Sequence, residues 1–175
     1  KHRARNLNLA HVYPHGALTI KLKGQTLTEM GELAEAGCVA FSQANTMVQD
    51  TQVLLRALQY AATFGHSVWL QPQDSYLARE GVAHDGEVAS RLGLAGIPVL
   101  AETVAIATVL QLVRSTGVRL HFARISSAAG LALIDESRAG GLKVTCDVSV
   151  NHLHLCDVDI GYFNTHCRLQ PPLRS

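Results

Sequence analysis

The chain has 175 residues, and its 15 Lys and Arg against 14 Asp and Glu leave a formal net charge of +1. This balance gives no electrostatic preference for nucleic acid or an anionic membrane surface, so we expect neither as a partner. The longest apolar stretch, residues 96–113, is interrupted by Glu102 and patterned as a helix, which argues against a membrane span. The four cysteines form no C-x-x-C pair, which predicts reduced thiols in a cytoplasmic protein.

A junction of helix, glycine and strand repeats along the chain. After a first strand within residues 10–20, helical periodicity predicts helices over 27–37, 51–65, 101–117 and 127–141. Each helix ends at a glycine, which readily adopts the left-handed conformation of a helix cap. Apolar strands follow each helix, at 38–41, 66–71, 118–126 and 142–149, and the segment 168–175 is predicted to end another strand.

Repeated βα units with short loops predict a parallel α/β fold, either an open doubly wound sheet or a (β/α)8 barrel of the TIM type. No G-x-G-x-x-G or G-x-x-x-x-G-K-[ST] motif follows a strand, which weakens the nucleotide-binding open sheet. A complete barrel needs roughly 250 residues, and the pattern here supplies only about five strands. We therefore expect residues 1–175 to form one domain covering roughly the middle half of a barrel, with further units before Lys1 and after Ser175.

In such folds the chemistry lies at the carboxyl ends of the strands. The side chains predicted there are poor metal ligands, because glutamine is neutral and arginine stays protonated: Gln43, Gln71, Gln73 and Arg124, with Asp74 the exception. The pair His152 and His154 falls beyond a strand, and we favour a packed, partly exposed pair over a metal site. Asp74 and Asp147 are each expected to cap a helix more readily than to act as acid or base.

Arg124 follows the strand "VRLHFA" and alternates with Leu120 and Phe122. If that face is the barrel interior, its side chain points into the mouth, where it pairs with Asp147, binds an anion or plugs a former ligand site. His121 then faces the helices as a satisfied core histidine. Ser126 and Ser127 are expected to cap the next helix, whose free N–H groups also suit an anion.

The strand ends and the segments around them resemble the dihydroorotase branch of the amidohydrolase superfamily. The resemblance runs through "YPHGALT", "ELAEAGCVAFSQAN", "RALQYAATFGHSVWLQPQD", "TGVRLHFARISSAAGLALI", "GLKVTCDVSVNHLHL" and "PPLRS". It implies a zinc-dependent (β/α)8 barrel that interconverts carbamoyl-aspartate and dihydroorotate. On this pattern Gln43 replaces a bridging acidic or carboxylated residue, and Gln71 and Arg124 replace metal histidines. Asn151 and His152 fall in a Pro-His-His-Leu segment, and Gln170 replaces a substrate-binding asparagine.

With three metal positions replaced, the resemblance is closest to the non-catalytic dihydroorotase-like chains that partner bacterial aspartate carbamoyltransferase. We therefore expect no catalytic residue, no metal and no cofactor, and a scaffold in homo- or hetero-oligomers. The alternative is an active zinc-dependent dihydroorotase or cyclic amidase that uses ligands outside this segment. A third hypothesis is a metal-independent binding module for an anion, drawing on six positions: Arg124, Ser126, Ser127, Asn151, His152 and Gln170.

Overall fold

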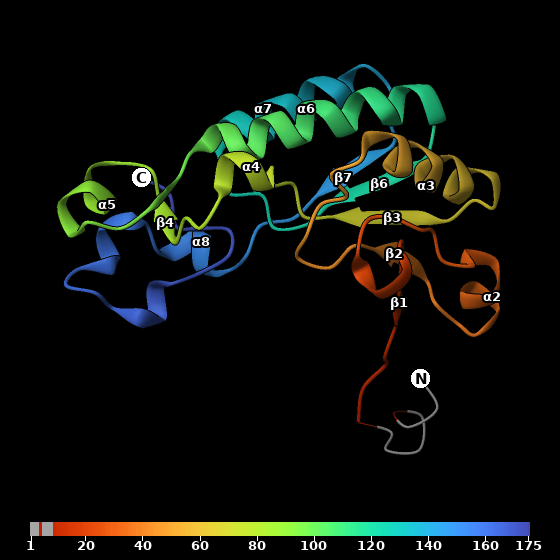
Figure 1. The fold of residues 1–175 in the computed structure, drawn as a ribbon, viewed down its shortest axis with the longest axis horizontal. Coiled ribbons are helices and arrows are strands. Elements are labelled where there is room, and N and C mark those ends of the chain that lie inside the picture. Colours follow the sequence, from red (N-terminus) through yellow and green to blue (C-terminus); the bar gives the residue numbers. More distant parts are fainter. Residues whose placement is uncertain (1–3, 5–8) are drawn as a thin grey trace.

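A five-stranded parallel sheet lies at the centre of the computed structural model, which describes residue 4 and residues 9–175 (Figure 1). The strand order is β1-β2-β3-β6-β7. The strands are β1 (His15–Ala17), β2 (Ala40–Ser42), β3 (Ser67–Leu70), β6 (Arg119–Phe122) and β7 (Val144–Cys146). Trp69 of β3 lies opposite His121 of β6, which lies opposite Thr145 of β7. The predicted parallel sheet is thus confirmed.

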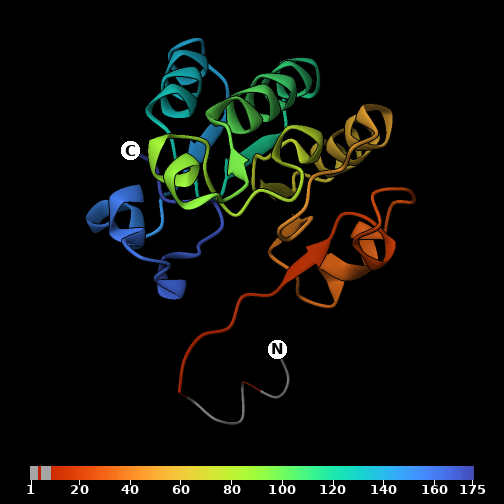
Figure 2. The same ribbon diagram turned by 60° about the vertical axis from the view of Figure 1, so that its left-hand side comes forward.

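Four helices form an arc around the outer face of this sheet (Figure 2). They are α2 (Met30–Glu35), α3 (Thr51–Thr63), α6 (Val99–Thr116) and α7 (Ala128–Ala139). The main core lies between helices and sheet, where Phe41, Leu58, Ile106, Phe122 and Ile134 are fully buried. Sequential βα units with their helices on one side of a curved parallel sheet are part of a (β/α)8 barrel, as the sequence predicts.

The helix boundaries follow from local chemistry. Asp50 begins α3, because its Oδ1 accepts hydrogen bonds from the main-chain N–H groups of Gln52 (2.8 Å) and Val53 (3.2 Å). Gly117 ends α6 in the left-handed conformation, with φ of 68°. The predicted helix–glycine–strand junctions are therefore present in the structure.

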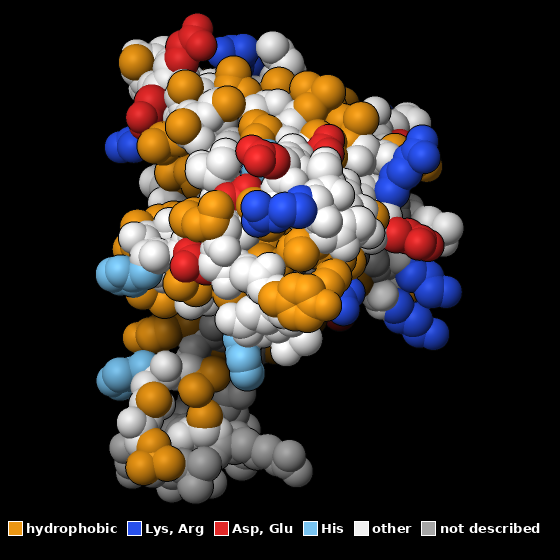
Figure 3. Space-filling model, turned by 90° about the vertical axis from the view of Figure 1, so that its left-hand side faces the viewer, with side chains coloured by type: hydrophobic (Ala, Val, Ile, Leu, Met, Phe, Trp, Pro, Cys, Tyr) orange, Lys and Arg blue, Asp and Glu red, His pale blue; other side chains and the backbone are white. Residues whose placement is uncertain are grey.

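A smaller lobe lies beside the sheet, on the left of Figure 1. Its elements are α4 (Ser75–Ala78), β4 (Ala83–His84), α5 (Glu87–Leu92), β5 (Gly96–Ile97), α8 (Asn151–His154) and the 3-10 helices η2 (Asp157–Ile160) and η3 (Thr165–Cys167); a further 3-10 helix, η1 (Ile20–Leu22), follows β1. Val88, Ile160 and Leu173 form part of its core. Its outer face mixes hydrophobic side chains with acidic and basic ones (Figure 3).

The prediction that residues 168–175 end a strand is wrong. The segment is irregular, and Pro171 and Pro172 lack the N–H groups that a sheet ladder needs. Leu173 instead inserts into the core of the smaller lobe, where it is 1% exposed. The main-chain oxygen of Arg174 accepts a hydrogen bond from Asp157 N–H (3.0 Å). The segment therefore stabilises the smaller lobe by packing into its core and by hydrogen-bonding to η2.

Glu102 joins α6 to the start of α7. Its side chain is 2% exposed, and its Oε2 accepts hydrogen bonds from Ser126 N–H (2.7 Å) and Oγ (2.6 Å). Its Oε1 accepts from Ser127 N–H (3.0 Å) and Oγ (2.5 Å). By length and composition α6 is apolar enough to cross a membrane. Its buried residues, with Ala101, Ile106 and Val113 among them, pack instead against the sheet and neighbouring helices.

We predict that Glu102→Ala lowers the free energy of unfolding of the full-length protein by about 3 kcal/mol. The substitution removes one carboxylate and leaves the donors of Ser126 and Ser127 without their acceptor in a buried site. Urea denaturation measures the change. Glu136→Ala, at an exposed position of α7, is the matched control and should change stability by less than about 0.5 kcal/mol. Equal losses in the two variants would contradict this role of Glu102.

Candidate functional site at the carboxyl ends of the strands

The guanidinium of Arg124 occupies the carboxyl edge of the sheet. Its NH2 group donates to Gln71 Oε1 and to Asn45 Oδ1, both at 2.5 Å. Its NH1 group donates to the main-chain oxygen of Gln170 at 3.3 Å. Gln71 follows β3, Asn45 follows β2, and Gln170 lies in the irregular segment after η3. One cationic side chain therefore connects three separate parts of the chain.

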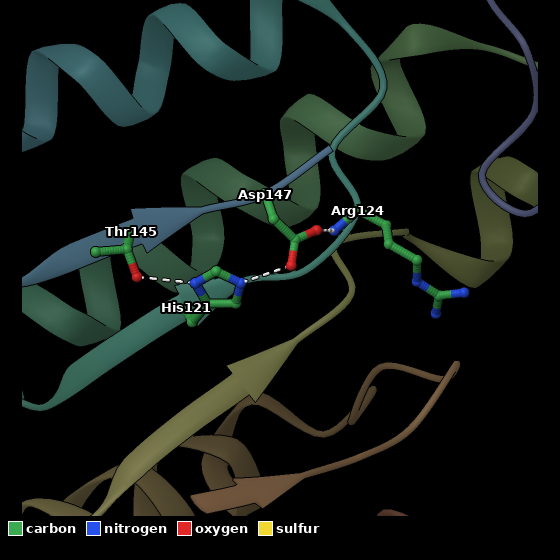
Figure 4. A network of polar contacts seen from close by, with 4 residues as sticks. All are labelled: His121, Arg124, Thr145 and Asp147. Atoms are coloured by element: carbon green, nitrogen blue, oxygen red, sulfur yellow. Dashed lines mark hydrogen bonds and ion pairs between the residues drawn. The ribbon is translucent and has the colours of Figure 1, made fainter. Parts of the chain in front are cut away.

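Asp147, just beyond β7, holds the main chain of Arg124. Its Oδ1 accepts the Arg124 N–H at 2.7 Å, and its Oδ2 lies 2.9 Å from His121 Nε2 (Figure 4). His121 Nδ1 in turn lies 2.8 Å from Thr145 Oγ1. Arg124 has φ of 57°, a conformation that is unfavourable for residues other than glycine. Asp147 thus bonds to the residue whose backbone is strained.

Two expectations about this strand are wrong. Leu120 and Phe122, and not His121, face the helices, because both are buried in the core with helix residues. His121 lies on the opposite face of the sheet, with its ring centroid 4.1 Å from that of Trp69. Arg124 still reaches the barrel mouth, but through its left-handed backbone rather than by alternation with Leu120 and Phe122. Asp147 contacts the His121 ring and accepts from the Arg124 main-chain N–H, and the Arg124 guanidinium bonds elsewhere, to Gln71, Asn45 and Gln170.

Gln43 and Gln71, at two of the predicted metal positions, are 1% and 3% exposed. Gln43 Oε1 accepts a hydrogen bond from Thr19 Oγ1 at 3.0 Å, and Gln71 Oε1 accepts from Arg124. Neither Nε2 group has a hydrogen-bond partner among the described residues. The structure therefore brings Gln71 and Arg124 into contact, while Gln43 bonds to Thr19.

Ser126 and Ser127 direct their N–H and hydroxyl groups to Glu102. Ser127 also caps α7, accepting from Gly130 N–H at 3.0 Å, as predicted. The anion at this helix start is thus the chain's own carboxylate. The sequence showed Glu102 only as an interruption of an apolar run. Binding of an external anion by the two serines stays a prediction.

Arg174 lies behind this cluster. Its Nε donates to Ser126 Oγ (3.1 Å), its NH1 donates to the main-chain oxygen of Ile97 (2.6 Å) and also lies 3.1 Å from His84 Nδ1. Burial lowers the pKa of the Arg174 guanidinium, and the Glu102 carboxylate opposes that shift. Glu102 and Arg174 are therefore opposite charges linked through one serine hydroxyl.

The other predicted residues are dispersed around this edge. Asn151 and His152 belong to α8, and His152 Nε2 lies 3.2 Å from the main-chain oxygen of Pro172, so its ring packs between segments. Asp74 caps α4 by accepting from Leu77 N–H at 2.8 Å. The Gln170 side chain makes a long contact of 3.5 Å with Asn45 O. Asn45 itself was missed by sequence reasoning, although its place in the loop that follows β2 is the signal that could have found it.

The residues at these strand ends do not fit a zinc ion. In the part of the chain that the structure describes, no three His, Cys, Asp or Glu side chains converge as metal ligands. Besides Asp147 and His121, which bond to each other, the edge offers neutral amides whose oxygens already accept hydrogen bonds, and a guanidinium that has no lone pair for a cation. Cys146 ends β7, but its pKa is raised, chiefly by burial and then by Asp135, which disfavours the thiolate that metals require.

Comparison with known proteins places the chain in a family. A family model described as dihydro-orotase-like matches residues 1–129. A "Dihydroorotase-like protein" of Pseudomonas aeruginosa is 47% identical over 173 residues, covering 99% of this chain and 41% of the relative. A dihydroorotase of Anaeromyxobacter sp. is 42% identical over 175 residues, covering 99% of this chain and 40% of the relative. The chain thus spans about two fifths of the length of these relatives.

Solved structures share the fold at low sequence identity. An L-hydantoinase (dihydropyrimidinase) from Arthrobacter aurescens superposes with a TM-score of 0.76 at 20% identity, covering 93% of this chain and 38% of that one. A D-hydantoinase (dihydropyrimidinase) from Thermus sp. gives a TM-score of 0.70 at 19% identity, covering 92% and 37%. These likenesses support the partial barrel and carry no statement about activity.

We predict that Asp147→Ala lowers the free energy of unfolding of the full-length protein by about 1 kcal/mol. The change removes the acceptor of the strained Arg124 N–H and the partner of His121. Thermal or urea denaturation measures the loss. Asp135→Ala is the matched control, because Asp135 pairs with Arg138 only on the exposed side of α7, at 3.6 Å. A loss no larger than that of Asp135→Ala would rule out a stabilising role for Asp147.

Proposed function

This chain belongs to the dihydro-orotase-like family, and we propose that the full-length protein takes part in de novo pyrimidine biosynthesis. We also propose that the mouth of its barrel is not catalytic. In this proposal the protein binds no zinc at the strand ends and hydrolyses no cyclic amide. Its role is structural, as a cytoplasmic scaffold for the catalytic chain of aspartate carbamoyltransferase. The two steps, loss of the metal site and gain of a partner, rest on different support and are tested separately.

The observation that carries the first step is the contact of the Arg124 guanidinium with Gln71 and Asn45. On the family pattern, Gln71 and Arg124 stand where metal histidines would be. A guanidinium repels a divalent ion by about 8 kcal/mol at roughly 4 Å, with an effective dielectric constant of about 20. Arg124 is also held by its own hydrogen bonds, so moving it aside would break several contacts. The amide of Gln71 supplies no compensating negative charge.

The support for the second step is the resemblance described above and the retention of a packed barrel. The hydrophobic core, the helix caps and the buried Glu102 cluster are intact around the altered strand ends. A chain that keeps its packing while its described strand ends bring no three metal-ligand side chains together retains what a scaffold needs. The near-neutral charge gives no reason to invoke nucleic acid or an anionic membrane as a partner. Homo- or hetero-oligomers are therefore the assemblies that we propose.

Metal analysis tests the first step. We expect the purified full-length protein to contain far less than one zinc per chain and to show no dihydroorotate hydrolysis when zinc is added. The double variant Gln71→His with Arg124→His restores two imidazoles and should retain more zinc than the parent. Stoichiometric zinc in the parent, with hydrolysis that a chelator abolishes, would establish the alternative of an active zinc-dependent cyclic amidase with ligands outside this segment.

Co-assembly tests the second step. The full-length protein and the aspartate carbamoyltransferase catalytic chain of the same organism are co-expressed and separated by size exclusion with light scattering. We expect one complex that contains both chains, and a transcarbamoylase that forms smaller or less stable assemblies when expressed alone. An unrelated barrel of similar size is the control partner. Separate elution of the two chains at micromolar concentration, with unchanged transcarbamoylase assembly, would remove the scaffold role.

A further inference from the structure

A cavity of about 180 Å³ opens into the core of the smaller lobe. Its lining comes from two segments, residues 82–94 and 160–168, which lie side by side on the left of Figure 1 in green and blue. The floor is apolar and consists of Val82, Ala83, Leu94 and Ile160, of which Ala83 and Ile160 belong to the buried core of the lobe. A cavity of roughly 150 Å³ with apolar walls holds a benzene molecule. This cavity therefore has room for a group of that size.

Phe163 lines one side of the cavity and has a strained backbone. Its φ is 59°, in the left-handed region that is unfavourable for a bulky residue. The main-chain N–H of Asn164 donates to the main-chain oxygen of Ile160 at 2.8 Å and so closes the turn that holds Phe163. The Phe163 side chain is 48% exposed although it borders an apolar floor. A half-exposed ring on a strained backbone contributes little to the fold, whereas a ligand in the cavity would bury it.

The polar side chains at the opening can all donate hydrogen bonds. They are those of Asn164, Thr165 and Arg168, and all three residues are exposed. Within the described part of the chain, the Arg168 guanidinium and the Thr165 hydroxyl have no hydrogen-bond or ion-pair partner. Asn164 Oδ1 accepts from His166 N–H at 3.1 Å, which leaves the Asn164 amide NH2 as the free group. None of the described lining residues is acidic, so the opening favours a negative charge.

We propose that this cavity binds a small monocarboxylate whose apolar body is about the size of a benzene ring. The apolar body lies on the floor beside Phe163, and the carboxylate lies at the opening, where Arg168 supplies the opposite charge. One cation beside an apolar floor favours this anion over neutral and cationic molecules of the same shape. The inference goes beyond the scaffold role and does not depend on it, because it uses neither the altered strand ends nor a partner chain.

Isothermal titration of the full-length protein with three compounds of similar shape tests the proposal. Benzoate is anionic, benzyl alcohol is neutral and benzylamine is cationic. We expect saturable binding of benzoate, binding of benzyl alcohol that is weaker by about tenfold, and no saturable binding of benzylamine. Arg168→Gln should weaken benzoate binding about tenfold and leave benzyl alcohol binding unchanged. Arg114→Gln, at an exposed position on α6 outside the cavity lining, is the matched control and should bind benzoate as the parent does.

A second variant, Phe163→Gly, separates ligand binding from stability. Glycine adopts a positive φ without strain, so the thermal midpoint should change little, while benzoate binding should weaken several-fold because the ring is lost. Tyr76→Ala removes an exposed aromatic ring outside the cavity lining and should retain the parent's affinity for benzoate. Unchanged benzoate binding in Phe163→Gly would contradict the role of this ring.

Three results of the titrations would overturn the proposal as a whole. The first is the absence of saturable benzoate binding. The second is binding of benzyl alcohol as tight as that of benzoate, which would indicate an apolar cavity that does not recognise charge. The third is equal weakening by Arg168→Gln and Arg114→Gln, which would indicate a general charge effect. None of these results bears on the zinc content or the co-assembly that test the proposed function.

Discussion

The hydrogen bonds of Arg124 connect more of the barrel mouth than any other side chain described here. Its guanidinium joins the end of β2 through Asn45, the end of β3 through Gln71, and the segment after η3 through Gln170. Its main-chain N–H joins the end of β7 through Asp147. Because the backbone of Arg124 is left-handed, this position is held by the surrounding contacts and not by local preference. Through these hydrogen bonds Arg124 connects several loops at the edge where parallel sheets usually bind a ligand.

A second cluster of hydrogen-bonded polar side chains lies on the outer side of the same edge. The buried Glu102 carboxylate accepts from Ser126 and Ser127 at the start of α7, where a helix N-terminus stabilises negative charge. Arg174 reaches the same serine and links it to the smaller lobe. In both clusters the charged group, Arg124 or Glu102, has several hydrogen-bond partners, and these offset the cost of its desolvation. Together they connect strand ends and loops through the chain's own side chains, which supports the proposed scaffold.

Much of the fold could be predicted because its signals are local. Helical periodicity and glycine ends placed α3, α6 and α7 close to their observed bounds, since their buried faces follow the sequence spacing. The two-residue strands β4 and β5 could not be predicted, because such short elements form only through tertiary contacts. Strand alternation set His121 opposite Leu120 and Phe122 but did not show which face the helices cover, and the orientation of Arg124 was beyond its reach. One positive φ after β6 reverses the alternation on which that reasoning depends.

In the candidate site, too, local features could be predicted and contacts between distant residues could not. The amides and the arginine at the strand ends were recognisable in the sequence, and the structure brings two of them, Gln71 and Arg124, into contact. The partners Asn45, Thr19 and Glu102 were not recognised, because hydrogen bonds between distant residues leave no periodic pattern.

Crystallography of the full-length protein grown in excess zinc, with anomalous data at the zinc edge, tests the central claim most directly. The account predicts no anomalous peak within coordination distance of Gln43, Gln71 or Arg124, and a guanidinium still bonded to Asn45 and Gln71. A zinc peak at these strand ends, with Arg124 turned away from Gln71, would contradict it.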